Sequence, residues 1–130
     1  LRPLPYDRPE QLVQLWTVTD RGDRVWFTDP DVADVERGAR TLAAVARYQG
    51  DVALVSGGGE AQRVPAALVS RDFLRVMGVR PVLGRWFAPD EQTPGGAPVV
   101  VVGEAFWRRA LGARRDLAGL TVRVDGRAHT

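Results

Sequence analysis

The sequence contains no cysteine, no lysine and a single histidine, His129, so several kinds of site chemistry lack their usual residues. Disulfide bonds and cysteine-ligated zinc sites both require cysteine. A serine triad needs a histidine base held by a carboxylate, and a phosphate-binding P-loop needs a lysine after its glycines. We therefore expect no catalytic residue, no metal ligand and no cofactor-binding residue in this chain.

Long apolar runs are also missing. The longest lies at residues 98–103 and is built around four consecutive valines. A membrane helix needs about 20 apolar residues, so no segment of this sequence is predicted to span a bilayer. The proline-rich start, residues 1–10, is predicted to be extended and irregular, and it lacks the apolar core of a secretory signal. Because the first residue is leucine, we expect the chain to be a piece of a longer protein.

Composition favours one ordinary globular domain, or most of one. The 130 residues are 45% hydrophobic and 26% charged, close to the averages for globular proteins. The formal charge is only +2, although all 18 basic residues are arginine. Apart from Arg108-Arg109 and Arg114-Arg115, the arginines are scattered among acidic residues. No basic stripe forms, so we expect no nucleic-acid partner.

Local patterns predict both strands and helices. The apolar and β-branched residues 11–19 predict a first strand, and residues 20–28 a loop. Asp29-Pro30 is typical of a helix start, with Asp29 as the cap and Pro30 at the first helical position. Apolar residues at three- and four-residue spacing extend that helix toward Gly50, with a bend at Gly38.

The second half reads as hairpins and short helices. Residues 52–56 and 62–69 flank a glycine-rich turn, and Pro65 places the second strand at an edge or bulge. A helix is predicted at 71–77, capped by Ser70 and ended by Gly78, and another at 104–111, ended by Gly112. The last hairpin begins at 120–124 and makes a tight primed turn at Asp125-Gly126. Between the two helices we predict an irregular segment at 79–87, an acidic turn at 88–92, a loop at 93–98 and a buried strand at 99–102. The fold class is therefore α+β, a mixed β-sheet with helices mainly on one face.

Several motifs resemble functional sites. We favour a structural explanation for each of them except Arg21-Gly22-Asp23, whose match to an integrin-binding tripeptide we interpret as coincidence. Ser56 and Ser70 fit a hairpin and a helix cap better than a nucleophile. Acidic residues near the helix start fit the helix dipole better than a metal, and adjacent acids in a turn fit a solvated surface. The motifs considered were Ser56, Ser70, the glycines 57–59, the acidic group Asp29, Asp31, Asp34 and Glu36, the pair Asp90 and Glu91, and the tripeptide Arg21-Gly22-Asp23.

Four tryptophans, at positions 16, 26, 86 and 107, are too widely spaced to form a base-stacking strip. We interpret them as core residues or as anchors for a partner. Trp86 lies in an irregular segment between loops rich in glycine and proline. An exposed side chain at Trp86 would indicate a partner surface.

An ordered series of short blocks resembles the MacB-like periplasmic core domain of FtsX-like ABC-transporter permeases. No single block is specific, but the ordered set covers essentially the whole chain. The helix near Val32 and Val35 has valines where relatives often carry bulky aromatic residues. The blocks are residues 1–6 (LRPLPY), 12–16 (LVQLW), Tyr48, 58–64 (GGEAQRV), 69–74 (VSRDFL), 77–87 (MGVRPVLGRWF), 98–102 (PVVVV), 106–109 (FWRR) and 120–127 (LTVRVDGR).

The resemblance implies a non-catalytic extracytoplasmic domain of an inner-membrane permease, residues 1–130, with its C-terminal part continuing beyond Thr130. It implies coupling of cytoplasmic ATP hydrolysis to conformational change, export or partner contact. Implied partners are a second permease subunit, an ATP-binding subunit or domain, and accessory envelope proteins; no cofactor is implied. A free-standing extracytoplasmic module that binds a peptide, lipid or glycan is the alternative, and a carboxylate-dependent hydrolase is a more distant one. A deep apolar pocket with convergent polar groups would favour the binding module.

Overall fold

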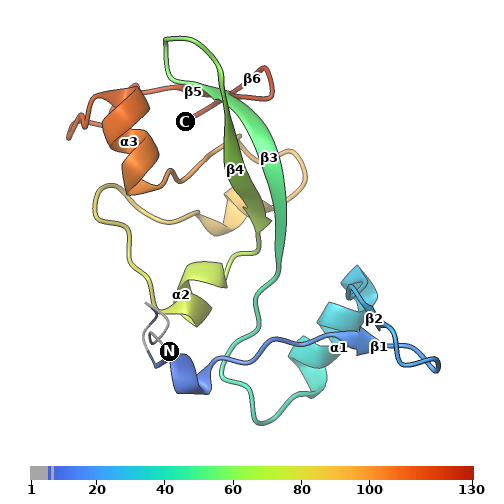
Figure 1. Ribbon diagram of the computed structural model, residues 1–130. Coiled ribbons are helices and arrows are strands. Elements are labelled where there is room, and N and C mark those ends of the chain that lie inside the picture. Colours follow the sequence, from blue (N-terminus) through green and yellow to red (C-terminus); the bar gives the residue numbers. More distant parts are fainter. Residues whose placement is uncertain (1–5, 7) are drawn as a thin grey trace. The chain divides into compact units, whose positions relative to one another are not determined.

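The computed structural model describes Tyr6 and residues 8–130, which form two compact units (Figure 1). The first unit holds the described residues up to Ala46 together with Asp72–Val79, and the second holds Arg47–Arg71 and Arg80–Thr130. Residues 1–5 and 7 of the predicted irregular start lie outside the described part. Within the described residues, no helix combines the length and the apolar character that a bilayer crossing requires.

The first unit begins with a short 3-10 helix, η1 (Pro9–Gln11), followed by a small hairpin of β1 (Thr17–Val18) and β2 (Arg24–Val25). The two strands are antiparallel, with Thr17 opposite Val25. The strand predicted over residues 11–19 is therefore too long, because within it only Thr17–Val18 pairs with another strand. That partner lies in the segment predicted to be a loop, where β-branched Val25 supplies a short strand.

Helix α1 (Asp29–Gly38) starts one residue earlier than predicted. Thr28, and not Asp29, is its N-cap: the Thr28 hydroxyl accepts from the Asp31 backbone N–H, and the Asp31 carboxylate accepts from the Thr28 backbone N–H at 3.0 Å. This reciprocal pair is a capping box. The helix ends at Gly38, so the predicted continuation toward Gly50 is wrong. Glycine is a poor helix former, and the residues after it form no helix.

Helix α2 (Phe73–Met77) completes the first unit. Gly78 ends it with φ 67°, as predicted for a left-handed C-cap. Its N-cap is Asp72, and the predicted cap by Ser70 is wrong. Ser70 belongs to the second unit, where its hydroxyl accepts a hydrogen bond from the Arg47 backbone N–H at 2.8 Å.

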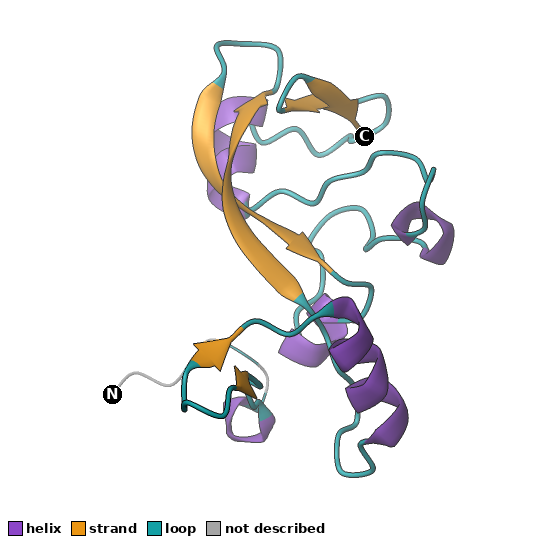
Figure 2. Cartoon of the chain, turned by 90° about the vertical axis from the view of Figure 1, so that its right-hand side faces the viewer, coloured by secondary structure: helices purple, strands orange, loops and turns teal. Residues whose placement is uncertain are grey.

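The second unit is built on a four-stranded antiparallel sheet in the order β4-β3-β5-β6 (Figure 2). The strands are β3 (Tyr48–Ser56), β4 (Gln62–Val69), β5 (Val122–Val124) and β6 (Arg127–His129). The long hairpin of β3 and β4 confirms the prediction. Pro65 lies on the edge strand opposite Val52, where a residue without a backbone N–H is tolerated.

The β5–β6 hairpin turns at Asp125-Gly126, with φ values of 49° and 81°, which confirms the predicted primed turn. Asp125 also joins this hairpin to β3. Its backbone N–H donates to the Leu54 carbonyl at 2.8 Å, and its carboxylate accepts from the Leu54 N–H at 2.8 Å. The carboxylate thus satisfies a backbone donor of β3 at the point where the β3–β5 ladder ends.

Residues 99–102 were predicted to form a buried strand, but the structure assigns no strand there. The segment is joined by two backbone hydrogen bonds to Thr130, which follows β6. The Val100 N–H donates to the Thr130 carbonyl at 3.0 Å, and the Thr130 N–H donates to the Pro98 carbonyl at 3.1 Å. In this bonding pattern Thr130 bonds to both neighbours of Val99, as in a parallel pair. The segment nevertheless lies outside the sheet, whose strands all pair antiparallel.

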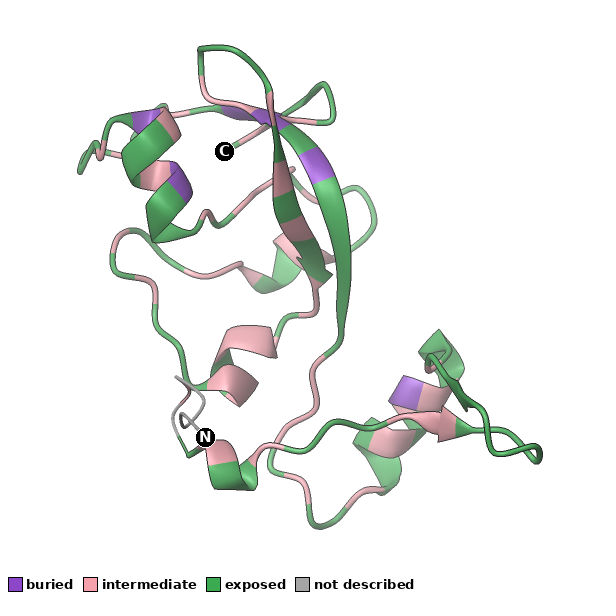
Figure 3. Ribbon diagram, in the orientation of Figure 1, coloured by how far each residue is buried: buried purple, intermediate pink, exposed green. Residues whose placement is uncertain are grey.

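Helix α3 (Glu104–Leu111) has the predicted bounds and packs on one face of the larger sheet (Figure 3). Its buried residues Phe106 and Leu111 meet inward-facing side chains of β3 and β5. The buried core cluster is Ala53, Val55, Phe106, Leu111 and Val122. The α+β class is therefore confirmed.

A 3-10 turn, η2 (Pro89–Gln92), interrupts the long irregular connection between α2 and α3. It lies where the acidic turn at 88–92 was predicted. The flanking segments 79–87 and 93–98 contain no helix or strand, as predicted. This connection positions the charged cluster described next.

Candidate functional site

Ser56, Ser70 and His129 have structural roles as strand residues or hydrogen-bond partners. Ser70 is bonded to Arg47, as described above, and His129 Nδ1 lies 2.9 Å from the Arg127 carbonyl oxygen. Ser56 ends β3 and pairs with Arg123 of β5, while His129 pairs with Val122 on the other edge of β5. A whole strand therefore separates Ser56 from His129, about 10 Å between their backbones, whereas a nucleophile and its base must lie within hydrogen-bond reach.

The acidic residues of α1 also have local partners. The Asp31 carboxylate accepts from the Thr28 hydroxyl at 2.6 Å and from its backbone N–H. These bonds, the side-chain bond first, lower the pKa of Asp31 from its ordinary value. Asp34 forms an exposed ion pair with Arg37. Within the described residues, no three or more histidines, cysteines or acids gather in a way that could hold a metal ion.

Two glycine motifs lie in turns. The glycines 57–59 connect β3 to β4, and a Cβ on Gly57 would overlap the side chain of Leu111 in α3, so this turn is packed against a helix and does not cradle a phosphate. Arg21-Gly22-Asp23 forms the exposed tip between β1 and β2. There the Asp23 N–H donates to the Thr19 hydroxyl at 3.2 Å, and Gly22 adopts φ 86°.

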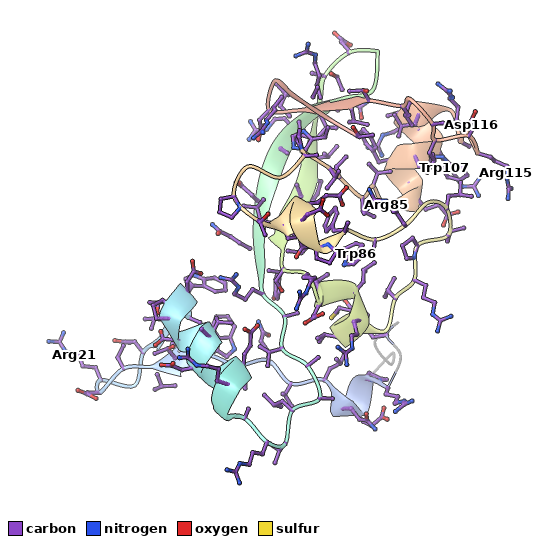
Figure 4. The ribbon with its side chains drawn as sticks, turned by 180° about the vertical axis from the view of Figure 1, so that it is seen from behind. Arg21, Arg85, Trp86, Trp107, Arg115 and Asp116 are labelled. Atoms are coloured by element: carbon purple, nitrogen blue, oxygen red, sulfur yellow. The ribbon has the colours of Figure 1, made fainter. Side chains whose placement is uncertain are left out.

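Arg85 and Glu91 form an ion pair in the second unit; Figure 4 labels Arg85 next to Trp86. The Arg85 guanidinium binds both carboxylate oxygens of Glu91, at 2.9 and 2.6 Å, and it also donates to the Trp86 carbonyl at 3.0 Å. Glu91 accepts a further hydrogen bond from the Ala88 backbone N–H at 2.7 Å. Bidentate arginine–carboxylate pairs of this kind are both directional and strong.

Glu91 was predicted to be a solvated surface acid, and this is wrong: its side chain is only 11% exposed. The Arg85 side-chain hydrogen bonds, followed by the Ala88 backbone bond, lower the pKa of Glu91 to about 2. The same contact raises the pKa of Arg85. The signal in the sequence was the Ala88–Glu91 spacing, because a glutamate three residues after an N-cap can reach back to the cap N–H.

The low pKa of Glu91 predicts a specific acid titration. The folded pKa lies below the ordinary value of about 4.3, so the contribution of Glu91 to stability is complete above that value and is lost as pH falls toward about 2. Carbon-detected NMR of the Glu91 carboxyl should show a midpoint near 2. The variant Arg85→Gln should raise this midpoint toward the ordinary value, because the largest cause of the lowered pKa is removed, whereas Arg21→Gln in the other unit should leave it unchanged. An ordinary midpoint in the unmodified protein would contradict the pair.

Trp86 is half-buried, so it does not provide the exposed aromatic surface considered above. Its indole N–H donates to the Arg71 carbonyl at 3.0 Å, and its ring lies 4.5 Å from that of Phe87. It therefore anchors the irregular segment to the end of β4. The exposed tryptophan is Trp26 in the first unit, 73% exposed and tilted against Trp16 at 5.1 Å.

The outward face of the β3–β4 hairpin carries Val52 and Leu54, each about half exposed. Together with Arg63 and Asp125 they line a depression that is open to solvent. The Asp125 carboxylate is bonded to the backbone of Leu54, so it does not converge on the depression as a free polar group. This depression is not the deep apolar pocket with convergent polar groups that a ligand-binding module requires.

The ordered blocks of sequence agree with one family of domains. A family model, the MacB-like periplasmic core domain, matches residues 5–130. The chain belongs to this family. As a MacB-like periplasmic core domain, it is a periplasmic domain of a MacB/FtsX-like ABC-transporter permease, which implies an inner-membrane protein with this segment in the periplasm. No curated protein and no solved structure matches the chain.

Membership confirms the resemblance drawn from the sequence. It adds no residue with a catalytic role, because what the family model supplies is a kind of domain and its range. Two features of this MacB-like domain escaped the sequence analysis. One is the Arg85–Glu91 pair, and the other is the packed approach of Leu111 to Gly57.

Proposed function

We propose that this MacB-like domain does no covalent chemistry and couples ATP hydrolysis on the cytoplasmic side to conformational change outside the membrane. Family membership supports the transporter context. The side chains that suggested chemistry support the mechanical role, because Ser70, Asp31 and Glu91 are each hydrogen-bonded within the fold. The observation that carries the proposal is the match of residues 5–130 to a transporter periplasmic domain.

A domain that transmits movement must resist deformation, and the second unit has suitable parts. The β3–β4 ladder pairs eight residues on each strand, from Tyr48 with Val69 to Val55 with Gln62. One end of the hairpin is fixed by the core with α3, and Asp125 ties β3 to β5. Packed interiors transmit strain because they are dense and have low compressibility.

The proposed partners follow from the transporter context. They are a second permease subunit in a dimer, an ATP-binding subunit or domain that acts through the membrane part, and accessory envelope proteins. Residues 1–130 form part of the extracytoplasmic domain in this proposal, and the rest of the domain follows in the parent protein. Movement produced by ATP binding would then reach substrates or accessory proteins by contact.

The test is a distance measurement in the assembled permease. Because the chain has no cysteine, a single Gly59→Cys substitution in the exposed β3–β4 turn gives one spin-label site in each copy of this domain. We expect the label-to-label distance in the reconstituted dimer to change when a non-hydrolysable ATP analogue is added. An ATPase subunit that cannot bind ATP is the control and should abolish the change.

An unchanged distance would contradict the coupling role. In that case, saturable binding of a peptide, lipid or glycan by the isolated chain would favour the free-standing binding module. Turnover of a substrate by the isolated chain would favour an enzyme. Each outcome therefore distinguishes the proposal from one of its rivals.

A further inference from the structure

Four arginines lie at the end of α3 and in the loop that follows it: Arg108, Arg109, Arg114 and Arg115, here called the arginine face. All four are exposed. Residues 104–116 contain these four arginines and only two acidic residues, so this short stretch carries a net charge equal to the +2 of the whole chain. Residues 104–116 therefore carry a local excess of positive charge in the second unit.

The loop that presents Arg114 and Arg115 is held in one conformation. Gly112 and Ala113 both adopt left-handed backbone angles, φ 61° and 52°. The Ala113 N–H donates to the Trp107 carbonyl at 3.0 Å, and the Trp107 indole donates to the Arg114 carbonyl at 2.8 Å. Figure 4 shows Trp107 on the helix with Arg115 and Asp116 beyond its end. A pre-ordered loop loses less conformational entropy when a partner binds.

Two of the four arginines of the arginine face, Arg108 and Arg109, have side-chain partners within the chain. Arg108 binds Glu104 at 2.9 Å, and Arg109 donates to the neutral Gln62 amide oxygen at 3.2 Å. Both also lie in the last turn, where the helix dipole favours positive charge. Arg114 and Arg115 follow the helix end, and no carboxylate in the described part of the chain lies within ion-pair distance of either. The neighbouring Asp116 carboxylate accepts from the Ala118 N–H at 3.0 Å.

The chemistry of the arginine face selects among partners. Arginine forks match carboxylates in bidentate geometry. A membrane surface is disfavoured because none of the strongly exposed large apolar side chains of the described chain lies in residues 104–116. Without apolar insertion, anionic lipids contribute only about 1 kcal/mol per arginine. A single nucleic-acid strand is disfavoured because Trp107, the aromatic side chain bonded to this loop, is half-buried and so offers no open face for base stacking.

We propose that the arginine face is a docking surface for an acidic segment of a partner protein. The inference rests on the proposed function, in which this domain acts by contact with other proteins. Arg114 and Arg115 provide the free guanidinium groups, and the hydrogen bonds of Trp107 fix the loop that carries them. A carboxylate-rich segment would neutralise the local excess of positive charge.

The test uses the 130-residue chain and a fluorescent peptide of alternating glutamate and glycine, with binding followed by anisotropy. The double variant Arg114→Gln/Arg115→Gln should weaken binding about tenfold, as expected for loss of about 1.4 kcal/mol. The matched control Arg21→Gln/Arg24→Gln removes the same charge from the first unit and should change the affinity less than twofold. The variant Arg114→Lys/Arg115→Lys keeps the charge but loses the planar fork, so it should show an intermediate loss.

Three results would overturn the proposal. They are equal losses in the two glutamine variants, no measurable peptide binding, and tighter binding to phosphatidylglycerol vesicles or to a single-stranded oligonucleotide than to the peptide. Thermal unfolding of each variant verifies that the fold is intact. The measurement needs neither ATP nor a membrane, so its failure is distinguishable from failure of the ATP-dependent distance change.

Discussion

Replacing Leu111 with alanine should lower the free energy of unfolding by about 2–5 kcal/mol, the range for large-to-small changes in a packed core. Leu111 is only 6% exposed and belongs to the cluster that joins α3 to β3 and β5. Leu68→Ala is the matched control, because Leu68 lies in the same unit but is 75% exposed. It should cost less than about 1 kcal/mol. Urea denaturation followed by tryptophan fluorescence measures both variants.

A second substitution shows whether Leu111 acts through the contact seen here. A Cβ added at Gly57 would overlap a terminal methyl of Leu111, so Gly57→Ala alone should destabilise the fold by about 1–3 kcal/mol. In the Leu111→Ala background that methyl is absent, and Gly57→Ala should cost much less or even fill part of the cavity. Simple additivity of the two changes would contradict the packing, because residues in contact are expected to couple.

Gly96→Ala should also destabilise the second unit, by about 1–3 kcal/mol. The new Cβ would lie 2.5 Å from the Asp90 carbonyl oxygen and 3.0 Å from backbone atoms of Glu91. Backbone atoms cannot rotate away as a side chain can, so η2 itself must shift. Gly59→Ala is the control, because a Cβ there has nothing within 4 Å and the residue does not adopt a positive φ.

The same variant has a spectroscopic readout. Moving η2 would displace the Glu91 carboxylate from Arg85 and from the Ala88 N–H, and these bonds hold the pKa of Glu91 at about 2. The pKa of Glu91 should therefore rise in Gly96→Ala and stay unchanged in Gly59→Ala. A destabilised Gly96→Ala with an unaltered Glu91 titration would show that the cost arises elsewhere.

Local signals in the sequence predicted the elements whose ends depend on a few neighbouring residues. Helix α3 ends at Gly112 and α2 at Gly78, both in the left-handed conformation that glycine adopts easily. The Asp125-Gly126 turn fixed the last hairpin in the same way. The prediction for α1 failed at both ends, since Thr28 competes with Asp29 for the cap and nothing in the periodicity marked Gly38 as a stop.

The charged and packed sites were harder to predict because they depend on distant partners. In the sequence, Glu91 is an ordinary acidic residue in a turn, and only folding brings Arg85 into contact with it. The importance of Arg114 and Arg115 depends on which carboxylates lie nearby, and a linear sequence does not give that information. The glycines 57–59 lie in the turn between β3 and β4, as the sequence predicted, and Arg21-Gly22-Asp23 lies between β1 and β2.

The sequence by itself determined the class of the protein: an α+β domain of the MacB-like family, with turns and helix ends set by glycine, proline and capping residues. Only the tertiary structure decided which segments became strands and which charges became paired. Residues 99–102 have the composition of a strand, yet the structure assigns no strand there, and Val100 bonds instead to Thr130 just after β6. The physical reason is that turns and caps form among neighbours in sequence, whereas strand pairing, ion pairing and close packing need residues that meet only after the chain has folded.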